Sequence, residues 1–269
     1  MKSSDLTHFA LREAPFSKEI GDDDLWLPSS KTDLVDELTD TIEARGSALL
    51  VGDPGVGKTC VMRALRQRLP LDRFRLTYCH NATLGRRDFY RQLCVALGIK
   101  ASATAAAVFH GVTTHVEELG RERIHPVFVI DEAHLLHPDV LDHLHILMNY
   151  DWDSRALLSL VLVGLSEIED RLAMRRNRSL YTRLHCRAVV DAHSADDTRE
   201  YLQYRLKAAG AERELFAIDA LPELHERARG SLREIDRIAT SALREAARRK
   251  RKLVTVDDIV AVDGVRARE

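Results

Sequence analysis

Ser47-Ala48-Leu49-Leu50-Val51-Gly52-Asp53-Pro54-Gly55-Val56-Gly57-Lys58-Thr59 is the stretch of the sequence that decides the fold. Its first five residues form an apolar run that predicts a buried strand. Gly52–Thr59 then matches G-x-x-x-x-G-K-[ST] in full, and the glycines of this motif let successive backbone N–H groups surround phosphates. The stretch therefore predicts an ATP site. We expect Gly52–Thr59 and Cys60 to contact the nucleotide, Lys58 to reach the β- and γ-phosphates, and Thr59 to ligate Mg²⁺.

An acidic pair follows a second apolar run later in the chain. Val127-Phe128-Val129-Ile130 predicts a buried strand, and Asp131-Glu132 comes directly after it. In open α/β sheets, ligands bind at the carboxyl ends of the strands. We therefore expect Asp131 to ligate the Mg²⁺ and Glu132 to act as general base on the attacking water. Lys58 and Glu132 are then catalytic residues of an ATPase.

The order of predicted elements indicates an α/β nucleotide-binding domain followed by helices. Strands alternate with helices up to about residue 190, which predicts a parallel sheet flanked by helices, and only helices follow. We expect an N-terminal arm over residues 1–28, an α/β domain over 29–192 and a small all-α lid over 193–269. The predicted strands are 47–51, 74–79, 127–130 and 157–163, and the predicted helices are 29–45, 58–69, 87–97, 140–149, 195–209, 220–229 and 231–250. The alanine-rich patch at 101–107 is assigned no element, and 254–260 is a final short segment.

The composition of the chain bears on the cellular compartment in which the protein works. The formal charge is −2, and the four cysteines form no CxxC pair. No apolar run approaches the roughly 20 residues that a membrane helix needs. Together with the absence of a signal peptide, these features predict a cytoplasmic protein with reduced thiols and no membrane anchor.

These motifs resemble those of AAA+ ATPases. The resemblance is carried by the Gly52–Thr59 loop, Asp131-Glu132-Ala133-His134, Val163-Gly164 and Gly230-Ser231-Leu232-Arg233, and it extends over roughly residues 10 to 260. A narrower resemblance joins the chain to the branch that holds the ExeA-type secretion ATPase and the transposition ATPases TniB, TnsC, MuB and IstB. Its segments are Pro15-Phe16, the DEAH element, residues 162–168 and Arg205-Leu206-Lys207-Ala208-Ala209-Gly210.

The resemblance implies further site residues. Arg183 falls where AAA+ proteins carry an arginine finger that reaches a neighbouring subunit's γ-phosphate, although Arg178 or Arg187 could be mistaken for it. Arg233 falls at the lid position that senses the γ-phosphate, and Trp26 and Leu27 fall where the N-terminal segment lines the adenine pocket. Leu165 stands where many relatives of the secretion branch carry a glutamine that senses the attacking water, and the neighbouring Ser166 is the alternative sensor. We therefore expect slow hydrolysis, with ATP acting as an assembly signal.

Three functions compete for such an ATPase. The first is a DNA-binding ATPase that forms a homo-oligomeric ring or filament on duplex DNA and recruits or regulates a transposase. The second is an ExeA-type secretion ATPase, and the third is an ATP-dependent remodeller of proteins. The secretion type resembles a longer chain with a membrane helix, so the length favours the transposition type. Thr83, Arg86 and Arg87 are the candidate DNA contacts, because such side chains hold phosphates without reading sequence.

Overall fold

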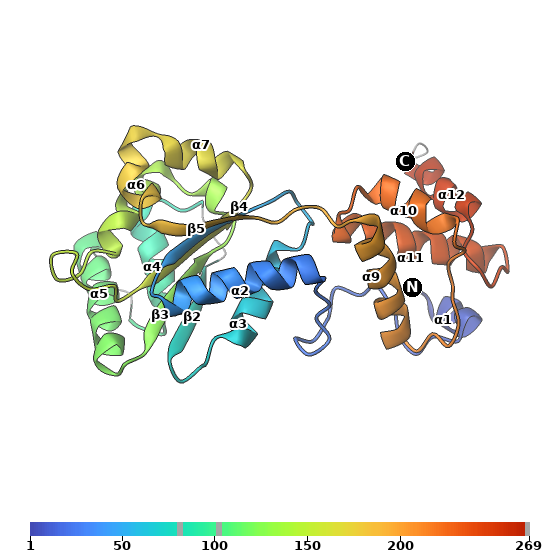
Figure 1. Ribbon diagram of the computed structural model, residues 1–269, viewed down its shortest axis with the longest axis horizontal. Helices are drawn as coiled ribbons and strands as arrows, with labels where there is room; N and C mark the ends of the chain where they lie inside the picture. Colours follow the sequence, from blue (N-terminus) through green and yellow to red (C-terminus); the bar gives the residue numbers. More distant parts are fainter. Residues whose placement is uncertain (80–82, 101–103, 267–269) are drawn as a thin grey trace. The chain divides into compact units, whose positions relative to one another are not determined.

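The fold is centred on a five-stranded parallel sheet with strand order β2-β3-β4-β1-β5 (Figure 1). The computed structural model of the protein describes residues 1–79, 83–100 and 104–266. Every residue of β1, β3 and β4 is buried, as expected for parallel strands that are covered on both faces. The strands are β1 (Ser47–Val51), β2 (Phe74–Cys79), β3 (His125–Ile130), β4 (Ser159–Gly164) and β5 (Leu184–Val189).

Contacts between Cα atoms divide the chain into two compact units. One, which we call the sheet unit, comprises residues 29–53 and 58–190, and the other, the helical unit, comprises residues 1–28, 54–57 and 191–269. The helices of the sheet unit are α2 (Ser29–Glu43), α3 (Lys58–Arg68), α4 (Arg86–Ala96), α5 (Ala105–Arg121), α6 (Pro138–Leu147), α7 (Glu167–Ala173) and α8 (Arg178–Tyr181), with single 3-10 turns η1 (Ala133–Leu135) and η2 (Arg175–Asn177).

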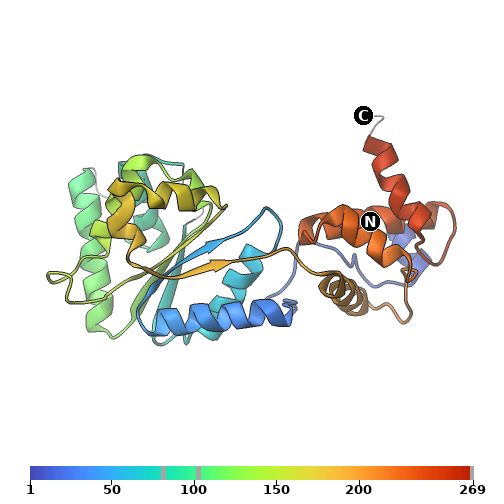
Figure 2. The same ribbon diagram turned by 45° about the horizontal axis from the view of Figure 1, so that its top comes forward.

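Two layers of helices sandwich the sheet. Helix α2 contacts β1, β5 and α3, whereas α4 and α5 contact each other, β2 and β3 (Figure 2). Because side chains alternate across a strand, Leu49, Phe128 and Leu162 share one buried cluster with the helices α4–α6. The expected α/β fold, a parallel sheet flanked by helices, is confirmed.

The sequence prediction lacks one strand of the sheet unit, β5, and three of its helices, α5, α7 and α8. The edge strand β5 alternates buried Leu184, Cys186 and Ala188 with exposed residues that include Arg187, so it lacks a continuous apolar run. Helix α5 buries Val108, Val112, Val116 and Leu119 at the spacing of one helix face. Part of α5 falls in the alanine-rich patch, of which residues 101–103 lie outside the described residues.

The helical unit is built from both ends of the chain. Phe9, Leu11 and Phe16 are buried in one core with Ile235 and Ile259. The strongly amphipathic α11 supplies more of this core than any other helix, through residues on a single face. The helices of the unit are α1 (Ser3–Phe9), α9 (Ala195–Ala208), α10 (Ala220–Ala228), α11 (Leu232–Arg248) and α12 (Val256–Arg266).

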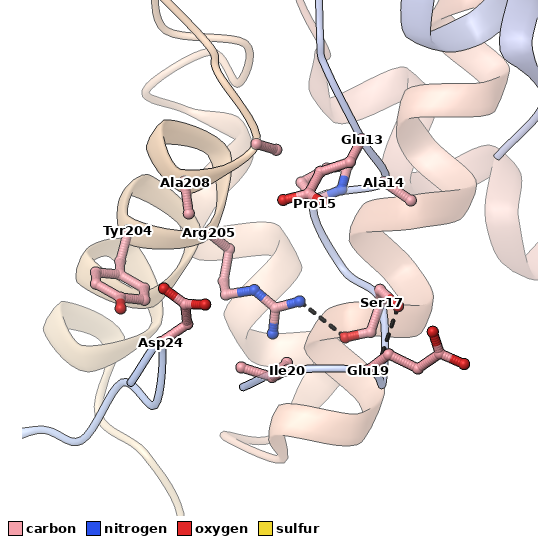
Figure 3. Close-up of a pocket in the computed structure, with 11 residues that line it drawn as sticks. Glu13, Ala14, Pro15, Ser17, Glu19, Ile20, Asp24, Tyr204, Arg205 and Ala208 are labelled. Atoms are coloured by element: carbon pink, nitrogen blue, oxygen red, sulfur yellow. Dashed lines mark hydrogen bonds between the residues drawn. The ribbon is translucent and has the colours of Figure 1, made fainter. Parts of the chain in front are cut away.

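Two of the segments that carry the narrower family resemblance meet in this unit. The guanidinium of Arg205 is buried and donates to the backbone oxygen of Ser17 at 2.8 Å and to the Tyr201 hydroxyl at 2.9 Å. The Arg12 amide donates to the Ala209 carbonyl at 2.9 Å. Figure 3 shows the pocket of about 330 Å³ that Arg205 lines between the N-terminal segment and α9. The segment 205–210 therefore holds the N-terminal arm in place.

Candidate functional site

The phosphate loop connects β1 to α3 at the carboxyl edge of the sheet. The Gly52 amide donates to the Gly164 carbonyl at 3.3 Å, which ties the start of the loop to the end of β4. Gly55 has φ +83° and Gly57 has φ +103°, a region that side-chain-bearing residues rarely adopt. The two glycines are thus required by the curvature that turns amide groups towards a bound phosphate.

The cation of the loop comes from the first residue of α3. Lys58 Nζ donates to the carbonyls of Gly52 at 2.6 Å and Asp53 at 3.0 Å. Thr59 follows it in the first turn and is exposed. Since a helix N-terminus carries partial positive charge, the ammonium group and the helix end both favour an anion at this position.

The acidic pair lies at the same edge of the sheet, because β3 is separated from β1 only by β4. The Asp131 amide donates to the Cys79 carbonyl at 3.0 Å, and Asp131 Oδ1 accepts the Glu132 amide at 2.9 Å. Glu132 has φ +53° and ψ +38°, a left-handed conformation that is costly for a glutamate, and its side chain is half exposed. Strain of this kind is typical of functional positions.

Tyr78 is a neighbour of the acidic pair that the sequence prediction missed. It lies on β2, which pairs with β3, and its hydroxyl donates to Asp131 Oδ2. Partial burial, followed by this hydrogen bond to Asp131, raises the pKa of Tyr78 well above its ordinary value. The phenol therefore stays protonated as a donor that fixes one carboxylate oxygen.

The donor set fits a magnesium nucleotide. Mg²⁺ prefers hard oxygen ligands and is held in proteins by few side chains together with the phosphates. The Thr59 hydroxyl and the Asp131 carboxylate provide such oxygens beside a loop suited to phosphates. When bound, the metal would neutralise charge on the transferring phosphoryl group, while Lys58 would hold its oxygens.

His134 contacts both the acidic pair and the end of β4. Its Nδ1 lies 3.6 Å from Glu132 Oε2 and accepts the Leu165 amide at 3.3 Å. The imidazole is only 12% exposed. The sequence prediction placed this histidine in the DEAH element but gave it no role, because nothing in the residue pattern shows that it turns towards β4.

Arg183 lies far from the phosphate loop of its own chain. It precedes β5, and because all the strands are parallel it is at the amino edge of the sheet, opposite Lys58 and Asp131. Its guanidinium donates to Asp153 Oδ2 at 2.7 Å and to the Ser179 carbonyl at 2.9 Å. The structure therefore does not bring Arg183 together with the other catalytic candidates within one subunit.

The remaining nucleotide candidates belong to the helical unit. Arg233 is exposed in the first turn of α11. The Trp26 ring packs against Tyr201 at a centroid distance of 5.2 Å and against His193 at 5.7 Å, while Leu27 is half-buried. Trp26 is thus part of the packing of this unit.

The candidate DNA contacts surround the start of α4. Thr83, Arg86 and Arg87 are all exposed, and Gly85 is the N-cap of the helix. The two arginines line a pocket of about 340 Å³ with three aromatic side chains. These aromatic residues are Tyr90, Phe109 and His143, which pack edge to face.

Comparison with known proteins agrees with this arrangement. Residues 40–172 match the protein-family model described as AAA domain. The chain is 31% identical over 265 residues to General secretion pathway protein A of Aeromonas hydrophila, which covers 96% of this chain and 48% of that protein. The chain thus spans about half the length of this curated relative.

Solved structures share the fold. Cdc6p from Pyrobaculum aerophilum has a TM-score of 0.68 at 19% identity, covering 89% of this chain and 67% of that chain. The Aeropyrum pernix ORC1 protein, solved in complex with DNA, has a TM-score of 0.66 at 20% identity, covering 89% of this chain and 66% of that chain. Residues 40–172 are therefore similar to an AAA domain, which agrees with ATP hydrolysis by this chain.

Proposed function

We propose that the protein is an ATPase whose subunits assemble with ATP on duplex DNA and that it recruits or regulates a transposase. Lys58, Thr59, Asp131 and Glu132 act in binding and hydrolysis of Mg·ATP. Trp26, Leu27 and Arg233 are further proposed contacts of the nucleotide. Residues 29–192 are the nucleotide-binding domain and 193–269 the lid.

The position of Arg183 is the observation that carries the oligomeric part of this proposal. A guanidinium at the amino edge of the sheet is remote from Lys58 of the same subunit, so it can complete a nucleotide site only in a neighbouring subunit. Arginine suits that role because its planar group pairs with phosphate oxygens in a bidentate manner. ATP bound between subunits then favours assembly by mass action.

The exposed side chains at the start of α4 support the DNA part. Thr83, Arg86 and Arg87 are exposed around a helix N-terminus, a combination that suits phosphate oxygens. The ORC1 protein with the same fold was solved in complex with DNA. Because these side chains would contact phosphates, DNA binding should weaken as the salt concentration rises.

A secretion-associated ATPase is the second candidate, and the identity of 31% to General secretion pathway protein A supports it. The match covers 96% of this chain although that relative is about twice as long, so the shorter length of this chain is no argument against the secretion candidate. Among the described residues, no helix has the length and hydrophobicity to cross a membrane. The narrower resemblance includes both the secretion and the transposition ATPases, and DNA-dependent assembly is the property that distinguishes the two candidates.

Size-exclusion chromatography with ATP and duplex DNA tests the proposal. We expect large assemblies only with both ligands, none for Lys58→Ala, and persistent assemblies for Glu132→Gln. Arg183→Ala should lose assembly, whereas Arg178→Ala, which removes an exposed arginine of α8, should keep it. Mixing Lys58→Ala with Arg183→Ala subunits should restore part of the ATPase activity, because each variant supplies the residue that the other lacks.

Different outcomes of these experiments contradict different parts of the proposed function. A chain that stays monomeric with both ligands contradicts the assembly mechanism. Assembly that is the same with and without DNA, and insensitive to salt, removes the DNA component and favours the secretion candidate. If Arg86→Ala and Arg87→Ala bind DNA as the parent does, the α4 contacts are wrong.

A further inference from the structure

The residue that directly follows β4 has no polar side chain, although the chemistry of ATP hydrolysis needs polar groups there. Strand β4 lies between β1, which carries the phosphate loop, and β3, which carries Asp131 and Glu132. Its last residue is Gly164, and the apolar Leu165 follows. A water that attacks a phosphate must be held in line with the leaving group by polar groups around it. Leu165 provides no polar group for this purpose other than those of its backbone.

The imidazole of His134 occupies this part of the edge. It accepts the Leu165 amide at Nδ1, and the same nitrogen lies 3.6 Å from Glu132 Oε2. The ring is therefore interposed between the end of β4 and the carboxylate that serves as general base. With 12% exposure it is largely shielded from solvent, so its orientation is set by protein contacts.

Three features of the surrounding structure fix that orientation. The left-handed Glu132 starts the 3-10 turn η1, which folds the chain back over β4. Arg171 of α7 then clamps the turn by donating to the carbonyls of His134 and Leu136. At Gly164, a Cβ would lie 3.1 Å from the His134 amide nitrogen and 3.2 Å from Nδ1, so a glycine is what permits this approach.

The two partners of Nδ1 are mutually exclusive. A ring nitrogen carries either one lone pair or one proton. With the Leu165 amide as donor, Nδ1 carries the lone pair, and the proton of the neutral ring is on Nε2. With the proton on Nδ1, the ring donates to the Glu132 carboxylate and no longer accepts the Leu165 amide. A displacement at the end of β4 that breaks the hydrogen bond from the Leu165 amide therefore leaves Nδ1 available to donate to the Glu132 carboxylate.

We propose that His134 is a positioning residue for Glu132 and couples the general base to the end of β4, where Leu165 provides no polar side chain. This rests on the proposed role of Glu132 in ATP hydrolysis. His134 does not touch the nucleotide in this scheme. It orients the carboxylate that takes the proton of the attacking water, so its loss lowers turnover and leaves nucleotide affinity intact.

The test is a double-mutant cycle of His134→Ala and Glu132→Gln. Misplacing a catalytic group by about 1 Å costs on the order of 100-fold in rate, so we expect His134→Ala to lower kcat about 10- to 100-fold. Equilibrium binding of a fluorescent ATP analogue should change less than about twofold, since no contact to the nucleotide is lost. In the Glu132→Gln background, His134→Ala should cause no further loss, because residues that act as a unit are not additive.

His134→Asn and His145→Ala complete the experiment. Asparagine keeps a polar acceptor near the position of Nδ1 and should retain more turnover than alanine, and it replaces the alanine variant if that variant does not fold. His145 lies on α6, outside the acidic pair, and its removal should leave kcat unchanged. The proposal is overturned if His134→Ala has normal kcat while Glu132→Gln is inactive, or if the loss is equal in both backgrounds. Normal hydrolysis by Glu132→Gln overturns the proposed base itself.

Discussion

Gly230→Ala should destabilise the helical unit far more than an ordinary glycine substitution. Gly230 has φ +67°, and a Cβ there would lie 2.3 Å from the His193 carbonyl oxygen and 2.8 Å from the His193 nitrogen. The His193 amide also donates to the Gly230 carbonyl at 3.0 Å, so these two backbones cannot separate without losing a hydrogen bond. The left-handed conformation costs alanine about 1–2 kcal/mol, and the overlap with backbone adds about 1–3 kcal/mol. We expect a total loss of about 2–5 kcal/mol.

Gly210→Ala is the matched control in the same unit. Gly210 also has a left-handed backbone, φ +91°, but its Cβ would meet side-chain atoms of Arg12, the nearest being Cγ at 2.9 Å. A flexible side chain can move aside, so only the conformational cost of about 1–2 kcal/mol should remain. The difference between the two variants therefore isolates the backbone overlap.

Tryptophan fluorescence reads out this unit selectively. The chain has two tryptophans. Trp152 is 97% exposed, so its environment changes little on unfolding, whereas Trp26 packs on His193 and Tyr201. The thermal midpoint of the Trp26 signal should fall by about 4 °C or more per kcal/mol. Equal shifts for Gly230→Ala and Gly210→Ala would refute the close approach of Gly230 to His193.

Three further predictions concern the site and its surroundings. Tyr78→Phe removes the donor to Asp131 and should raise the Mg²⁺ concentration for half-maximal nucleotide binding about 3- to 10-fold, measured by titration calorimetry, and an unchanged requirement contradicts the role of Tyr78. Asp153→Ala should cost less than about 1 kcal/mol in the free energy of unfolding, because its pair with Arg183 is partly exposed, and it should leave ATP-dependent assembly intact. Burial raises the pKa of Asp236 from 3.8 to about 6, so its contribution to stability is complete below pH 3.8 and is lost as the pH rises through 6. Asp236→Asn should lack this step of up to about 3 kcal/mol between pH 4 and pH 7, and parallel pH profiles of the two proteins contradict the assignment.

The sequence was most informative where chemistry and local pattern coincide. The phosphate loop and the Asp131-Glu132 pair are short motifs flanked by apolar runs, and both lie at one sheet edge as expected. The edge strand β5 was missed because an edge strand needs only alternate apolar residues. His134 and Tyr78 were missed because their contacts depend on strand order and on the left-handed backbone of Glu132, which a glutamate in the sequence does not signal.

The sequence also indicated the N-terminal arm without showing where it packs. In the sequence, Pro15-Phe16 and the segment 205–210 indicated only the narrower family resemblance. In the structure, Arg205 binds the backbone of this arm at Ser17, and Gly210 leaves room for Arg12. Contacts between segments so far apart in the chain leave no periodic pattern in either one, so residue types alone do not predict them.

The shared core of the two chain ends has a consequence for biosynthesis. Phe9 and Phe16 are translated well before their core partners Ile235 and Ile259. At typical elongation rates the arm waits about 10–50 s with these aromatic side chains exposed. The sheet unit can fold during this interval, whereas the helical unit must close a loop that contains a whole folded domain. Newly made chains should therefore pass through a state in which the sheet unit is folded and Phe9 and Phe16 are still exposed. We expect chaperones to bind most usefully at this stage.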